Sequence, residues 1–63
     1  MSVKRRDLIR YLEKNDFFLK REGKRHSFYT HEDGRAIAVK RHKIFDRISA
    51  NILCKQAGIP AIF

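Results

Sequence analysis

The sequence predicts an α+β fold, in the order α-β-β-β-α, with a three-stranded antiparallel sheet and both helices on one face of it. Apolar residues recur with helical spacing near both ends of the chain, whereas short runs of β-branched and aromatic residues occupy its middle. The dipeptide Asp33-Gly34, which is typical of a tight hairpin turn, separates the last two of these runs. The 63 residues are expected to form a single domain, residues 1–63.

The first helix is expected over residues 3–14. Its apolar stripe consists of Leu8, Tyr11 and Leu12, which fall at i, i+3 and i+4, and Ile9 widens it. Ser2 is a candidate N-cap, because a serine hydroxyl can accept a hydrogen bond from the first turn. The dipeptide Asn15-Asp16 is expected to end the helix, since both residue types tolerate turn geometry.

Three strands follow, at residues 17–21, 26–31 and 36–39. The first two are separated by Glu22-Gly23-Lys24, a charged break that contains a glycine. In the third, Ile37 and Val39 are expected on one face of the sheet and the two alanines on the other.

The second helix is expected to begin at Asp46, a good N-cap, after a basic connector at residues 40–43. Its predicted apolar stripe consists of Ile48, Ile52 and Leu53, extended by Ile44. Gly58 is expected just beyond the end of the helix, with Ile59 at the hydrophobic contact position and Pro60 preventing continuation. The second helix therefore has signals at both ends.

The charge of the chain favours a polyanionic partner. Fifteen Lys and Arg face seven Asp and Glu, which gives a formal net charge of +8. The basic runs lie at residues 4–6, 20–25 and 40–43. Nucleic acid is the leading candidate partner and an acidic protein surface the second. A small sheet with one open face suits RNA better than a DNA major groove.

Size and cysteine content limit the kind of site. A chain of this length has no room for a deep active-site cavity enclosed by one subunit. The single cysteine, Cys54, excludes an internal disulfide and a thiolate zinc site, and no metal or cofactor is expected. Charges interrupt every apolar stretch, which argues against a signal peptide or a membrane span and favours a cytoplasmic setting.

His26 has two interpretations on the residues alone. It shares strand parity with Phe28, so it is either a strand-end histidine bonded to the backbone or a general base. RNA carries its own nucleophile, the 2′-hydroxyl group, so cleavage requires a proton acceptor with a pKa near neutrality. An unperturbed imidazole, with a pKa of about 6.5, meets that requirement.

The residues expected to contact RNA are Lys24, Arg25, Tyr29, Arg35, Arg41, His42 and Lys43. The cations would hold phosphates, and Tyr29 or Phe28 would stack a base. A structural alternative for Tyr29 is packing opposite Ala36 or Ala38. His31 is a possible second acid or base, although strand alternation places it on the face opposite to His26.

The run HSFYTHEDGR at residues 26–35 resembles the core of the HicA (YcfA-like) toxin family. The members of that family are mRNA interferases of toxin–antitoxin pairs. Further matching segments are RDLI at 6–9, LEKN at 12–15, RHK at 41–43 and ILCKQAGI at 52–59. The resemblance implies a double-stranded-RNA-binding-like fold and a metal-independent endoribonuclease with His26 as its catalytic residue. It also implies a HicB-type antitoxin as partner.

Two segments depart from the family pattern. Lys24-Arg25 stand where the family has Gly-Ser before the histidine, and Lys40 stands where members tend to carry proline. On the resemblance as a whole, the expected function is an RNA-cleaving toxin. The alternative is a non-catalytic RNA-binding module of the same fold. The expected partner is a small, net-acidic antitoxin, encoded next door, that covers His26 in competition with RNA.

Overall fold

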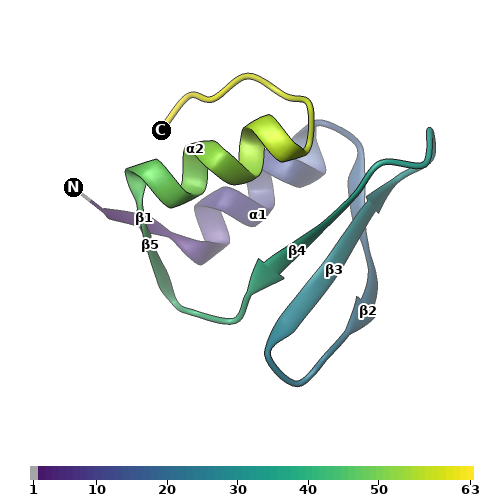
Figure 1. Cartoon of the computed structure of the whole chain (residues 1–63), viewed down its shortest axis with the longest axis horizontal. Helices are drawn as coiled ribbons and strands as arrows, with labels where there is room; N and C mark the ends of the chain where they lie inside the picture. Colours follow the sequence, from purple (N-terminus) through teal and green to yellow (C-terminus); the bar gives the residue numbers. More distant parts are fainter. Residues whose placement is uncertain (1) are drawn as a thin grey trace.

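A computed structural model describes residues 2–63 (Figure 1). The elements in chain order are β1 (Ser2–Lys4), α1 (Arg5–Lys14), β2 (Phe17–Glu22), β3 (His26–His31), β4 (Ala36–Lys40), β5 (Ile44–Asp46) and α2 (Arg47–Gln56). In Figure 1 the β2-β3-β4 sheet lies at the lower right and the two helices at the upper left, with α2 nearer the viewer than α1. None of the helices within residues 2–63 is long and apolar enough to cross a membrane.

The central sheet has the strand order β2-β3-β4 and is antiparallel throughout. Side chains alternate along β3 and β4, so Ser27, Tyr29, Ile37 and Val39 are buried on one face while their neighbours are more exposed. Leu8 and Leu12 of α1 join the same core as Ala50 and Cys54 of α2. The predicted α+β fold, with a three-stranded antiparallel sheet and two helices, is confirmed.

A second, two-stranded sheet was not predicted. β1 pairs with β5 in antiparallel register, Ser2 opposite Asp46 and Lys4 opposite Ile44. Ser2 is therefore a strand residue and not the N-cap of α1; Lys4 occupies that position, and no side-chain cap is formed there within residues 2–63. Ile44 likewise belongs to β5 and not to the second helix. Strands of three residues are too short to show alternation in the sequence.

The ends of α2 agree with the prediction, but its orientation does not. Asp46 caps the helix by accepting a hydrogen bond of 2.7 Å from the Ser49 N–H. Gly58 has a φ of 72°, and the Ile59 N–H donates to the Cys54 carbonyl at 3.0 Å, which completes a Schellman motif.

The side chains that α2 buries are Ala50 and Cys54, whereas Ile48 and Ile52 of the predicted stripe are 74% and 49% exposed. Small side chains let the helix backbone approach the core closely, and the bulky isoleucines then face away from it.

The β3–β4 hairpin turns at Asp33-Gly34, as predicted. Gly34 has a φ of 99°, and the His31 N–H donates to the Arg35 carbonyl at 2.8 Å. The turn fixes the register in which His26 lies opposite Lys40 and Tyr29 opposite Ile37. The candidate site is built at the other end of this hairpin.

Candidate active site

His26 is the first residue of β3 and lies on the open face of the sheet. It is half-buried, and its ring centroid is 6.3 Å from that of Phe28, two residues along the same face. Its backbone carbonyl accepts a hydrogen bond of 2.7 Å from the Gly23 N–H, which closes the β2–β3 turn (residues 23–25). The backbone, not the imidazole, therefore holds the strand end in place.

His26 lines a groove that contains a second histidine. One part of the groove, about 350 Å³ in volume, is lined by Arg25, His26, Lys40, Arg41 and His42. A larger part, about 530 Å³, again includes His26, Lys40 and His42 and reaches α2 at Ser49, Ile52 and Gln56. The β2–β3 turn and the β4–β5 connector (residues 41–43), far apart in the sequence, are thus brought together around one imidazole.

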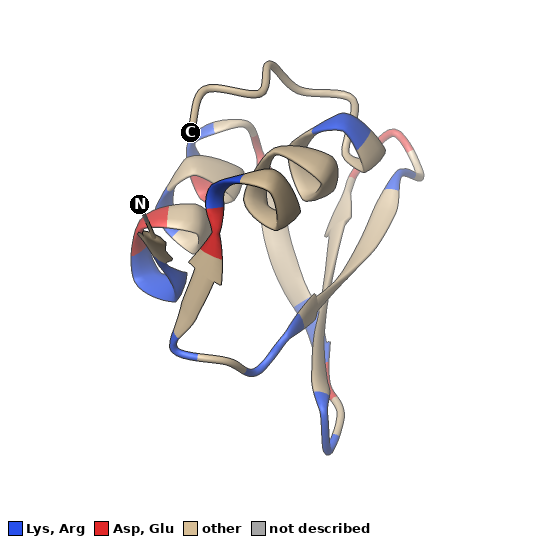
Figure 2. Cartoon of the chain, turned by 60° about the vertical axis from the view of Figure 1, so that its left-hand side comes forward, with Lys and Arg blue, Asp and Glu red and all other residues tan. Residues whose placement is uncertain are grey.

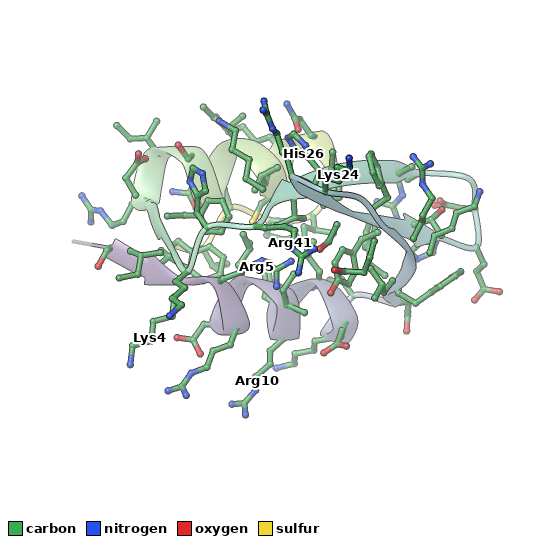
Figure 3. The ribbon with its side chains drawn as sticks, turned by 90° about the horizontal axis from the view of Figure 1, so that it is seen from below. Lys4, Arg5, Arg10, Lys24, His26 and Arg41 are labelled. Atoms are coloured by element: carbon green, nitrogen blue, oxygen red, sulfur yellow. The ribbon has the colours of Figure 1, made fainter. Side chains whose placement is uncertain are left out.

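A polar network centred on the buried Ser27 lies on the reverse side of the sheet, directly behind His26, and its charged members Glu22 and Arg41 are exposed to solvent. Ser27 is fully buried, and its hydroxyl accepts from the Arg5 guanidinium at 2.7 Å and donates to the Glu22 carboxylate at 2.6 Å. The other Glu22 oxygen lies 3.3 Å from Arg41, which also donates to the Gly23 carbonyl at 3.2 Å. In Figure 3, Arg5 and Arg41 lie between the side of the molecule that carries His26 and Lys24 and the side that carries Lys4 and Arg10.

The same network holds the connector. The Arg5 side chain donates to the Lys40 carbonyl at 3.3 Å, and its backbone N–H donates to the Lys43 carbonyl at 2.8 Å. The Arg41 N–H donates to the Arg25 carbonyl at 3.1 Å. The connector is therefore tied to the start of α1, and the β2–β3 turn is tied to the connector.

A model of a protein family described as the HicA toxin of bacterial toxin–antitoxin systems matches residues 5–59. This chain belongs to the HicA toxin family. The match runs from α1 to just beyond α2 and includes His26, the connector and the polar network. The comparisons with curated proteins and with solved structures found no match. Membership implies that this HicA chain is a toxin with an antitoxin partner.

The basic residues of this HicA chain gather on several segments near the groove. Lys and Arg occupy the β2–β3 turn, the connector and the first turn of α1 (Figure 2). Of the residues predicted to bind RNA, Arg25, Arg41 and His42 line the groove with His26, and Lys24 is exposed in the β2–β3 turn. Lys43 is also exposed, but it lines a separate hollow with Lys4, Arg5, Arg6 and Ile44. Arg41 is paired with Glu22, whereas none of the ion pairs found within residues 2–63 involves Lys24 or Arg25.

Tyr29 contradicts the prediction that it stacks an RNA base. It is only 6% exposed and lies on the core face of β3, where it pairs with Leu19 and Ile37, not with an alanine. Burial raises the pKa of its phenol. Phe28 is the ring on the face of His26; it pairs with Ala38 and carries the Arg21 guanidinium 4.6 Å from its centroid.

Arg35 and His31 lie at the far end of the hairpin, five strand positions or roughly 17 Å from His26. Arg35 donates to the Asp33 carboxylate at 2.8 Å and to the Ala57 carbonyl at 2.6 Å, so it joins the hairpin to the end of α2. Hydrogen bonds from Arg35 hold the pKa of Asp33 below its usual value. Arg35 therefore does not lie beside His26, and its contact with an RNA phosphate stays a prediction.

His31 lies on the face opposite to His26, as expected, and packs edge-on against Phe17 with ring centroids 5.3 Å apart. Its Nδ1 accepts a hydrogen bond of 3.1 Å from the Asp33 N–H. The structure thus separates His31 from the groove and places His42 in it. In the described part of the chain, no three His, Cys, Asp or Glu side chains cluster as a metal site would require.

Sequence reasoning missed Arg5, Glu22 and Ser27. Arg5 belongs to a basic run whose only evident signal is its charge, and Ser27 is one small polar residue in a strand. The available signal was that Ser27 shares strand parity with Tyr29: if one is in the core, so is the other. A buried hydroxyl must then find polar partners.

Proposed function

We propose that this HicA toxin is an endoribonuclease, an mRNA interferase, in which His26 is the general base and His42 the general acid. The observation that carries the proposal is that both histidines line one open groove together with Arg25 and Lys40. We further propose that a HicB-type antitoxin neutralises the enzyme by covering this groove.

The reaction uses the nucleophile that RNA itself provides. The 2′-hydroxyl oxygen attacks the adjacent phosphorus while the His26 imidazole removes its proton. The bond between phosphorus and the 5′ oxygen breaks, and the His42 imidazolium gives its proton to that oxygen. The products are a 2′,3′-cyclic phosphate and a 5′-hydroxyl group. The reaction leaves His26 protonated and His42 neutral.

Cations near the two imidazoles stabilise the charge that develops on the phosphate oxygens. Lys40 lies directly opposite His26 in the β3–β4 register, a pairing that places the two Cβ atoms about 5 Å apart. Arg25 reaches the groove from the turn just before His26. Such preorganised charge is worth most where the transition state carries more charge than the substrate.

A specific feature favours the alternative, a non-catalytic RNA-binding module of the same fold. Lys24-Arg25 stand in the turn that presents His26, where the family carries Gly-Ser before its histidine. The cationic turn would bind RNA in either case. Cleavage therefore separates the two functions, whereas binding does not.

The test uses single-stranded RNA and the variants His26→Ala and His42→Ala, with His31→Ala, at the far end of the hairpin, as the matched histidine control. We expect each groove variant to slow cleavage by about 100-fold or more, while RNA binding and the circular dichroism spectrum stay close to those of the wild type. Cleavage that survives His26→Ala contradicts the assignment.

A substrate with sulfur in place of the bridging 5′ oxygen distinguishes the two roles. Its leaving group needs no proton, so it should restore the rate of His42→Ala but not that of His26→Ala. An equal response of both variants would contradict the assignment of His42 as the acid.

A further inference from the structure

Three isoleucines form an exposed apolar stripe beside the groove. Ile48 and Ile52 lie one helical turn apart on α2 and are 74% and 49% exposed; Ile44, on β5, is 57% exposed and lines the groove together with Ile52. The buried residues Ala50 and Cys54 each follow a stripe residue by two positions, about 200° around the helix. The two isoleucines of α2 therefore face away from the core of their own chain.

The stripe continues into the groove of His26. Ile44 and Ile52 line the groove's larger part, together with the apolar side chains of Phe45 and Leu53. Ile48 lies outside the groove, one helical turn from Ile52. A partner that packs on Ile48 and extends along the stripe would therefore also contact the groove that contains the two histidines.

The chemistry of the stripe fits a protein and not RNA. Aliphatic side chains offer no charge to a phosphate and no aromatic ring on which a base can stack. Exposed apolar surface of this kind is typical of protein–protein contact. Exposed cations flank it on α2 and on the strand opposite His26, namely Arg47, Lys55 and Lys40, so a partner with acidic side chains around an apolar anchor is complementary to it.

We propose that the isoleucine stripe is the docking anchor of the antitoxin, whose apolar side chains pack on it while flanking Asp and Glu side chains meet the cations. The family membership of the chain supplies the reason to expect such a partner. The claim that docking blocks RNA cleavage rests on the proposed function. The claim that the stripe binds the antitoxin does not depend on it. Affinity comes mainly from the stripe, and inhibition comes from the groove beside it.

The experiment uses the purified product of the neighbouring open reading frame and the His26→Ala chain, which can be prepared without toxicity. In that background, Ile48→Ser is compared with Ile62→Ser, a matched change at an isoleucine that is 62% exposed in the C-terminal tail. We expect Ile48→Ser to weaken antitoxin binding by about 10- to 100-fold and Ile62→Ser to change it little. Equal affinities for both variants would overturn the proposal.

Charge is tested at the same position. Ile48→Glu and Ile48→Lys both remove the apolar anchor, but an acidic partner should bind the glutamate variant more weakly than the lysine variant. The reverse order would contradict an acidic partner. Thermal melts establish that each variant is folded.

Two other occupants give different results. If RNA occupies the stripe, Ile48→Ser weakens RNA binding as much as antitoxin binding; if a second copy does, the variant abolishes a dimer on gel filtration and leaves antitoxin affinity intact. Either result would overturn the proposal. Failure of the proposed function is separate, because it appears as a wild-type chain that does not cleave RNA. When cleavage occurs, Ile48→Ser should cleave at the wild-type rate yet resist antitoxin concentrations that silence the wild type.

Discussion

Replacing Ser27 with alanine tests the network that holds the strand end of His26. The Ser27 side chain is fully buried, and its hydroxyl bonds two charged groups, Arg5 at 2.7 Å and Glu22 at 2.6 Å. Hydrogen bonds to charged groups contribute about 1.5–3 kcal/mol. In the variant, Arg5 keeps its bond to Lys40 and Glu22 keeps its ion pair with Arg41, which reduces the loss. We therefore expect the free energy of unfolding to fall by about 1–2 kcal/mol.

The assay is thermal and urea unfolding followed by circular dichroism. For a domain of this size, a loss of about 1–2 kcal/mol lowers the Tm by roughly 5–15 °C. Ser2→Ala, at an exposed position of β1, is the control and should change stability by less than about 0.5 kcal/mol. If the Ser27 variant unfolds like the Ser2 variant, the hydroxyl does not stabilise the fold and the reasoning is wrong.

Three further predictions concern charge, the thiol and pH. The affinity of the His26→Ala chain for single-stranded RNA should fall as salt rises, with a logarithmic slope of about −0.7 per neutralised phosphate, whereas a flat response would remove the electrostatic basis of binding. Because Cys54 is buried and burial raises the pKa of its thiol, a thiol reagent such as DTNB should react slowly with the native chain and fully in denaturant. The hydrogen bond from the Ser49 N–H lowers the pKa of the Asp46 carboxyl below its ordinary value of 3.8. The stability that this cap contributes is therefore complete above pH 3.8 and is lost as the pH falls below it. The urea midpoint of Asp46→Asn should accordingly depend less on pH than that of the wild type in this range, and equal dependence would contradict the capping role.

Local signals in the sequence were sufficient for the middle of the chain and for the ends of its second helix. Asp46, Gly58 and Asp33-Gly34 specify a cap, a helix end and a hairpin, because each acts through the backbone of its nearest neighbours. The alternation of buried and exposed residues along β3 and β4 is likewise a local signal, and together with the two helical patterns it predicts the α+β fold. The family resemblance drew attention to His26, and the match over residues 5–59 confirms the family but leaves the role of the histidine as a proposal.

Only the tertiary structure decided which faces are buried and which distant segments meet. Strand alternation places His26 and Tyr29 on opposite faces of the sheet but does not determine which of them faces the core. The periodicity of the isoleucines in α2 likewise does not determine which side of the helix packs against the core. Packing against small side chains turned Ile48 outward. The pairing of β1 with β5 and the hydrogen bond from Arg5 to Ser27 join residues more than 20 positions apart. The sequence by itself therefore determined the elements and their order, whereas long-range packing, which no local preference encodes, decided that His42 and not His31 shares the groove with His26.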